Sequence, residues 1–356
     1  MVRRHPISAK GNRWALWLLA PLVAVLVACG ESDPDGMGAG EPGFRPADPE
    51  VPGPFVVAFY EASYEVAGFG SFSALVHYPA GISDTEPLQE PPEEPYPVVV
   101  LSNGLAASAV MLSWLSEHLA SHGYVVLGFT PQNPFALDVT NWADGFRQGL
   151  AYLQVENSRV DSPVFGLARM ERTGLIGLSM GGAGALEAAG SGVKADAVVA
   201  LAPGINDLGR FIFMETIEAA ERIQVPTQIQ VGNRDCFVNP KEGSLLRFTN
   251  LTDQGVATYF DIIAARKLYV EINGANHVAY INEEIADIGN FIVAGLIPID
   301  CMPGISTAEQ HRVVAKYATM WFDTYLYETT FWKQTLFGRG IREDFENGVL
   351  SDFRID

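Results

Sequence analysis

The stretch Thr173-Gly-Leu-Ile-Gly-Leu-Ser-Met-Gly-Gly-Ala183 decides how the chain folds. Its first half, residues 173–178, is an apolar run typical of a buried strand, and a helix of small residues is expected over about 181–190. The turn between them has the sequence Gly177-Leu-Ser179-Met-Gly181, a G-x-S-x-G pattern. In that pattern the serine sits on a tight, strained turn, and small residues two positions to either side let strand and helix approach. We therefore predict that Ser179 is a nucleophile presented on this turn.

Alternating strands and helices extend to both sides of this stretch. The continuous apolar run from Tyr96 to Leu101 is typical of a strand buried on both faces. Such alternation predicts an α/β fold, with a mostly parallel, twisted sheet flanked by helices. Two earlier segments, residues 55–60 and 70–78, are expected to form a leading antiparallel pair. The other elements are expected at a helix that ends near 123, a strand at 124–129, a helix at 141–155, strands at 196–202, 226–231 and 267–272, and a closing amphipathic helix at 310–325.

A base and an acid for the serine are predicted from the order of the later strands. A serine hydroxyl becomes a good nucleophile only when a base takes its proton and an acid orients that base. With a serine on such a turn, the acid and then a histidine follow on loops after later strands. Asp235 comes just after the strand 226–231, and His277 comes just after the strand 267–272. We therefore predict a triad of Ser179, His277 and Asp235.

Other acids and histidines remain as alternatives. Asp207, Asp253 and Asp261 also lie between the nucleophile and the base, although none follows a strand end so closely. Of the remaining histidines, His5 lies in the predicted signal peptide. The others are expected to be surface or half-buried residues outside the site: His77 on an early strand, His118 and His122 on the first helix, and His311 at the start of the last helix.

Acyl transfer also requires donors for the developing oxyanion. The first predicted donor is the backbone N–H of Met180, the residue after the nucleophile. The second is expected in the loop after the strand that ends at Leu101. Gly104 allows a tight turn there, and the N–H of Leu105 is the predicted donor, with Gly104 and Ala106 as alternatives.

The composition limits the class of protein. Hydrophobic residues make up 48% of the 356 residues, enough to build a large core, and charged residues make up only 18%. The formal net charge of −19 repels phosphate backbones, so the sequence gives no sign of nucleic-acid binding. The oligomeric state is not indicated by the sequence.

The N-terminus resembles a bacterial lipoprotein signal peptide, residues 1–28. Basic residues precede an apolar run at 14–28, which is shorter than the roughly 20 residues of a transmembrane helix. The run ends in Leu26-Val-Ala-Cys29, which resembles the lipobox whose cysteine is acylated and becomes the new N-terminus. An ordinary signal peptide with a chance cysteine is the alternative. We expect an exported protein that contacts a bacterial membrane only through the lipid on Cys29. Gly30 favours the outer membrane where one exists.

A tether is expected between this anchor and the folded part of the chain. Residues 29–54 are rich in Gly, Pro and acidic residues and contain few large apolar side chains, so they cannot offset their ordering entropy by burial. No repeat or second linker follows. Residues 55–356 are therefore predicted to form one domain.

A disulfide is predicted between Cys236 and Cys301. Export places the domain where disulfides persist, and these two thiols are all that remain once Cys29 carries lipid. The bridge would join the loop of the predicted acid to the segment before the last helix. Two unpaired thiols are the alternative, because sequence alone does not show whether the two residues lie close enough.

Several of these segments together resemble a known group. The Gly177–Gly182 turn, the Ala200-Leu-Ala-Pro203 strand end, the Gly-Ala-Asn-His277 segment and the Ala315–Asp323 helix are similar to those of dienelactone-hydrolase-related esterases. Within these, the chain resembles the branch with cutinase-like polyesterases and platelet-activating-factor acetylhydrolases. The resemblance covers nearly the whole domain. It implies an α/β-hydrolase fold and a carboxylic ester hydrolase that uses neither a metal nor an organic cofactor.

Three positions depart from the polyesterase pattern. Leu178 stands where such enzymes commonly have His or Trp, Gly204 where they have Trp, and Leu105 where they have an aromatic residue. The missing rings predict poor hydrolysis of aromatic polyesters. Between Pro203 and Pro226 there is room for one amphipathic helix, at 208–223, so no large cap domain is expected over the site.

We therefore expect a serine esterase that acts on a small-molecule, lipid or polyester ester through an acyl-enzyme. One alternative is cleavage of another acyl bond: a lipid acetyl ester, a thioester or an amide. The other is a surface lipoprotein that keeps the fold as a non-catalytic binding module.

Overall fold

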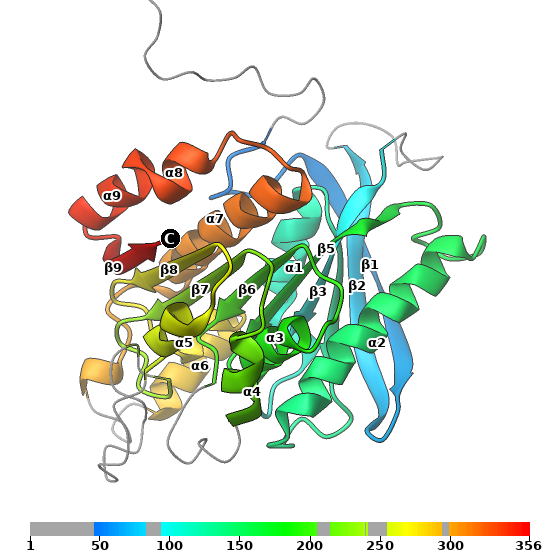
Figure 1. Ribbon diagram of the computed structural model, residues 1–356, viewed down its shortest axis with the longest axis horizontal. Coiled ribbons are helices and arrows are strands. Elements are labelled where there is room, and N and C mark those ends of the chain that lie inside the picture. Colours follow the sequence, from blue (N-terminus) through cyan, green and yellow to red (C-terminus); the bar gives the residue numbers. More distant parts are fainter. Residues whose placement is uncertain (1–45, 83–93, 205–213, 239, 241–254, 294–298) are drawn as a thin grey trace, which may run out of the picture. The chain divides into compact units, whose positions relative to one another are not determined.

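The computed structural model describes residues 46–82, 94–204, 214–238, 240, 255–293 and 299–356 (Figure 1). All of these residues belong to the compact unit that begins at Gly40. The predicted signal peptide and Cys29 lie outside the described residues.

In the described part of the chain, nine strands form one sheet in the order β1-β2-β4-β3-β5-β6-β7-β8-β9. Strands β3 to β8 run parallel, whereas β1 and β2 at one edge and β9 at the other add antiparallel pairs. The predicted mostly parallel sheet and its leading antiparallel pair are therefore confirmed. The strands are β1 (Phe55–Val66), β2 (Gly70–Ile82), β3 (Tyr96–Ser102), β4 (Val125–Thr130), β5 (Ala168–Leu178), β6 (Ala197–Leu201), β7 (Thr227–Gly232), β8 (Lys267–Ile272) and β9 (Leu350–Ile355).

Helices cover both faces of this sheet (Figure 1). The helices α2 (Val139–Ser158), α3 (Met180–Gly190) and α4 (Met214–Ala220) lie on one face, and α1 (Ser113–Ser121) and α7 (Thr307–Leu326) lie on the other. The remaining helices are α5 (Ala257–Ile262), α6 (Glu283–Val293), α8 (Lys333–Phe337) and α9 (Arg339–Glu346). None of the helices in the described ranges combines the length and apolarity needed to cross a membrane.

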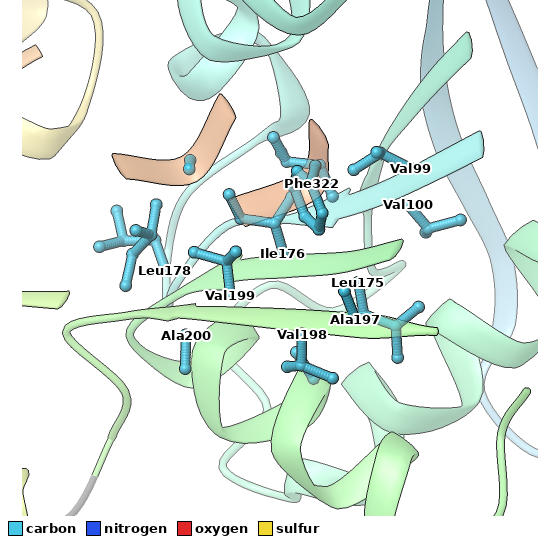
Figure 2. Close-up of a cluster of buried hydrophobic side chains, with 14 of the residues drawn as sticks. Val99, Val100, Leu175, Ile176, Leu178, Ala197, Val198, Val199, Ala200 and Phe322 are labelled. Atoms are coloured by element: carbon cyan, nitrogen blue, oxygen red, sulfur yellow. The ribbon is translucent and has the colours of Figure 1, made fainter. Parts of the chain in front are cut away.

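The central strands are apolar on both sides because both of their faces are covered. Ile176 and Val199 point toward Phe322 of α7, while Val198 and Ala200 point to the opposite face (Figure 2). All of these side chains are fully buried. Continuous apolar runs are therefore the correct signal for these strands, and the strand at 173–178 is observed as the end of β5.

The C-terminal part differs from the prediction. The helix expected at 310–325 is present as α7, but it does not close the fold, because α8, α9 and β9 follow it. Strand β9 has the sequence Leu-Ser-Asp-Phe-Arg-Ile and pairs antiparallel with β8 at the sheet edge. Polar side chains are tolerated at such an edge, so the segment lacks the apolar run that identified the inner strands. The two N-terminal strands also extend further than predicted, because their outer residues alternate with polar ones.

The end of the predicted tether contacts the folded domain. Glu50 forms ion pairs with Arg312 and Lys316 of α7. The backbone N–H of Gly53 donates to the Ser121 hydroxyl at 2.8 Å. Ion pairs and backbone hydrogen bonds need little apolar surface, so the composition of residues 48–53 did not indicate these contacts.

Candidate active site

Ser179 occupies the predicted turn between β5 and α3. Its backbone has φ 57° and ψ −116°, a conformation that is strained for a residue with a side chain. Two backbone hydrogen bonds hold it there: Ser179 N–H donates to Leu201 O, and Gly204 N–H donates to Ser179 O, each at 2.9 Å. The turn is thus fixed to the end of the neighbouring strand β6. This rigidity presents the serine at the carboxyl edge of the sheet.

Glycines make room for this turn. A Cβ at Gly177 would overlap the carbonyl oxygen of Gly181, and a Cβ at Gly181 would lie 2.5 Å from Asn103 O. The loop after β3 also passes close to the serine, because a Cβ at Gly104 would lie 2.7 Å from the Ser179 Cβ. Strand, helix and the β3 loop therefore meet around Ser179 at separations that only glycine allows.

Asp235 and His277 form a hydrogen-bonded pair at the same edge of the sheet. Asp235 follows β7, His277 follows β8, and the His277 Nδ1–H donates to Asp235 Oδ2 at 2.7 Å. The other carboxylate oxygen accepts the backbone N–H groups of Phe237 and Val238, both at 3.0 Å. Asp235 is 1% exposed. The carboxylate is therefore fixed in direction and leaves the Nε2 of His277 available as a base.

The two loops that carry this pair are also joined through their backbones. The N–H of Arg234 donates to Ala275 O at 3.0 Å, and the N–H of Gly274 donates to Asn233 Oδ1 at 2.8 Å. Because parallel strands β5, β7 and β8 end at one edge, the structure brings the three predicted residues to that edge.

Three of the alternative histidines lie elsewhere, and the fourth, His311, is half-buried as predicted and donates to Ile281 O. His77 stacks on Phe59, His118 hydrogen-bonds with Thr319 of α7, and the His122 Nε2–H donates to Val51 O. The prediction that they are surface or half-buried was wrong for these three, because they face covering elements and are at most 9% exposed. Burial lowers the pKa of His77 to about 4 and that of His118 to about 3, so both are neutral structural residues near pH 7.

Among the described residues, no alternative acid takes the place of Asp235 as the partner of His277. Asp261 lies on α5 with an exposed side chain and faces Arg354 at 3.4 Å. Asp207 and Asp253 lie outside the described residues.

One alternative for the second oxyanion donor is removed. The N–H of Ala106 already donates to Pro134 O at 2.7 Å, so it does not face a substrate oxygen. The same bond fixes the loop that carries Gly104 and Leu105 above the serine. Leu105 keeps its place as the predicted second donor beside Met180.

The chain matches the model of the PET hydrolase-like family over residues 49–297. The chain belongs to this family. It is also similar to a bis(hydroxyethyl) terephthalate hydrolase from Streptomyces coelicolor, with 35% identity over 206 residues. That alignment covers 56% of this chain and 61% of the relative, so the chain spans about three fifths of the curated relative's length. The predicted resemblance to polyesterase-type α/β-hydrolases is thereby confirmed.

Against this PET hydrolase-like framework, one aromatic side chain at the site was missed by sequence reasoning. Phe237 stacks on the imidazole of His277, with ring centroids 5.2 Å apart and planes at 29°. It stands two residues after the acid, where an aromatic residue was visible but carried no periodic or motif signal. The site therefore has an aromatic ring at Phe237, although it lacks the rings that polyesterases commonly have at positions 105, 178 and 204.

The predicted disulfide is present between Cys236 and Cys301, with their Cα atoms 5.6 Å apart. It joins the residue after the acid to a segment beyond residue 297, where the family match ends. Among the described residues, no group of three or more His, Cys, Asp or Glu side chains is arranged to hold a metal ion.

Proposed function

We propose that this PET hydrolase-like protein hydrolyses carboxylic esters through an acyl-enzyme on Ser179. The observation that carries the proposal is the 2.7 Å hydrogen bond between His277 and the buried Asp235, on the sheet edge that also presents the strained Ser179. A buried acid oriented toward a histidine, on the sheet edge that presents a strained serine, is the arrangement expected of an activated serine nucleophile.

The proposed reaction follows from these positions. His277 Nε2 takes the hydroxyl proton as Ser179 Oγ attacks the ester carbonyl carbon, and Asp235 stabilises the resulting imidazolium. The N–H groups of Met180 and Leu105 hold the oxyanion. The intermediate collapses as His277 gives the proton to the leaving alcohol. Water then attacks the acyl-enzyme by the same steps and releases the acid.

Small, soluble esters are the proposed substrates, including hydroxyethyl esters of aromatic acids. The related Streptomyces protein, named for bis(hydroxyethyl) terephthalate, supports this class. Phe237 beside His277 supplies one ring against which an aromatic acyl group could stack. The Leu105 side chain is 41% exposed but has no aromatic ring. The Leu178 side chain also has no ring, and it is buried. We therefore place small esters ahead of aromatic polymers.

Turnover of soluble esters and of a polymer tests this proposal. We expect the purified protein to hydrolyse bis(hydroxyethyl) terephthalate and short-chain p-nitrophenyl esters, followed by chromatography and absorbance. Stacking contributes about 1 kcal/mol per ring pair, and the rings that would stack on a polymer are missing. The release of soluble product from a terephthalate polyester film should therefore be slower than hydrolysis of the soluble ester by roughly tenfold or more.

A fluorophosphonate probe provides the control, because it labels only an activated serine. Labelling of the parent but not of Ser179→Ala is expected. A protein that is neither labelled nor active on any ester would instead be a binding module. One that cleaves only amides or thioesters would be a hydrolase of another acyl bond.

We also propose that the protein is exported and anchored by lipid on Cys29. The proposal rests on the basic residues, the short apolar run and the Leu26–Cys29 pattern at the N-terminus. Cys29→Ser should abolish acylation and cleavage at this site, and mass spectrometry of the mature N-terminus measures both. An unacylated N-terminus at another residue of the unmutated protein would contradict the proposal.

A further inference from the structure

The residue before the predicted base is held by a buried amide from α7. Asn276 is 2% exposed, and its backbone N–H donates to Gln310 Oε1 at 3.0 Å. Gln310 Nε2–H donates back to Asn276 O at 2.9 Å. The fully buried Gln310 side chain thus pairs with both backbone polar groups of Asn276, as a neighbouring strand would. These two bonds fix the peptide planes on either side of Asn276, including the one that leads into His277.

The side chain of Asn276 extends this contact to the acid loop. Its Nδ2–H donates to Cys301 O at 3.3 Å, and its Oδ1 accepts the N–H of Ala279 at 3.0 Å. Cys301 is bonded to Cys236, the neighbour of Asp235. A closed ring of contacts therefore runs from the acid through the disulfide and Asn276 to the base, and returns through the bond between His277 and Asp235.

The next residue of α7 holds the other end of the base loop. His311 Nε2–H donates to Ile281 O at 2.9 Å, and its ring stacks on Trp114 with centroids 3.7 Å apart. Trp114 Nε1–H in turn donates to Tyr280 O at 2.9 Å. Gln310 and His311 of α7 therefore fix the two ends of the loop from 276 to 281, and Trp114 of α1 supports the second end.

We propose that Gln310 is a positioning residue that orients His277 for catalysis through its paired hydrogen bonds with Asn276. The proposal rests on the proposed ester hydrolysis. Gln310 lies beyond residue 297, where the family match ends, and it contacts the base loop rather than a substrate. Its effect should therefore fall on kcat and leave KM unchanged. A misplacement of the base by about 1 Å is enough to lower the rate on the order of a hundredfold.

A matched control separates positioning from stability. Gln228 of β7 is also fully buried, and its Nε2–H donates to a backbone carbonyl of α7, Tyr317 O, at 3.0 Å. Gln228→Met and Gln310→Met each remove one buried amide and two of its hydrogen bonds: Gln228 donates to Tyr317 O and accepts from Gln230, and Gln310 pairs with the backbone of Asn276. Only Gln310→Met disturbs the base loop.

The first measurement is the steady-state hydrolysis of a p-nitrophenyl ester by folded protein, below the unfolding temperature of each variant. Gln310→Met should lower kcat by roughly tenfold to a hundredfold with KM within twofold of the parent. Gln228→Met should keep kcat within twofold. A Gln310→Met kcat equal to that of Gln228→Met would overturn the proposal. If the Met variant does not fold, Gln310→Asn gives the same comparison with Gln228→Asn, because each keeps the amide group but shortens the side chain that holds it.

The second measurement does not depend on activity. The His277 Nδ1 proton, donated to Asp235 Oδ2 at 2.7 Å, is expected to give a strongly downfield proton NMR resonance. This resonance should shift or broaden in Gln310→Met and stay unchanged in Gln228→Met; an unchanged resonance in both would reject positioning. If the parent protein hydrolyses no ester and its serine is not labelled, the proposed function fails, while this resonance still reports on the role of Gln310.

Discussion

His277→Ala is expected to lower kcat for a short-chain p-nitrophenyl ester by a factor on the order of a million, as much as Ser179→Ala does, because the two residues act as a unit. Without the imidazole, no group takes the serine proton or returns it to the leaving alcohol. Asp235→Asn should cost less, on the order of ten-thousandfold, because it mainly disturbs the orientation and tautomer of His277.

Initial rates of the purified variants, with unfolding curves to show that each is folded, measure these effects. His77→Ala is the matched control. This buried histidine of β2 stacks on Phe59 and should affect stability while leaving kcat within a few-fold of the parent. A His277→Ala enzyme within tenfold of the parent would remove the residue from the mechanism.

The residues of the site could be predicted because each follows the end of a predicted strand. The strand before Ser179 ends in a continuous apolar run, whereas buried polar residues interrupt the strands before Asp235 and His277: Gln228 and Gln230 in β7, and Glu271 in β8. A loop of turn residues follows each strand. Chain order then indicates the role of each residue. The position of these loops relative to one another follows from the parallel sheet and needs no further information.

The supporting contacts could not be predicted in this way. Gln310 and Phe237 act through tertiary contacts with no periodicity or motif, and Gln310 sits in an amphipathic helix where a polar residue is ordinarily assigned to the surface. The buried His118 and His122 were misassigned for the same reason, because their partners Thr319 and Val51 are distant in the sequence. Strand β9 was missed because polar residues interrupt its apolar ones in the sequence, as is common in an edge strand.

The disulfide between Cys236 and Cys301 shows how one covalent contact serves both stability and the site. The bridge joins residues 65 positions apart, so it restricts a long loop of the unfolded chain. In the chain-entropy model this restriction contributes about 4 kcal/mol to the free energy of unfolding. The bridge also contacts the site at two points. Asp235 is the residue before Cys236, and the Asn276 side chain donates to the carbonyl oxygen of Cys301.

The Cys236→Ser/Cys301→Ser double variant is therefore expected to lose up to about 4 kcal/mol of unfolding free energy, measured by denaturant titration without reductant. Its kcat should fall by less than that of Gln310→Met, because the Phe237 and Val238 N–H groups still hold Asp235 and Gln310 still holds Asn276. Reductant should destabilise the parent by the same amount and leave the double variant unchanged, which separates loss of the bridge from the effect of the serines.

Two titratable thiols from these positions in denatured, unreduced protein prepared under oxidising conditions would show that the bridge does not form. If the bridge forms but reductant does not change the unfolding free energy, the constraint on the unfolded chain must be small, and the bridge would then act mainly by joining the acid loop to the segment that holds the base.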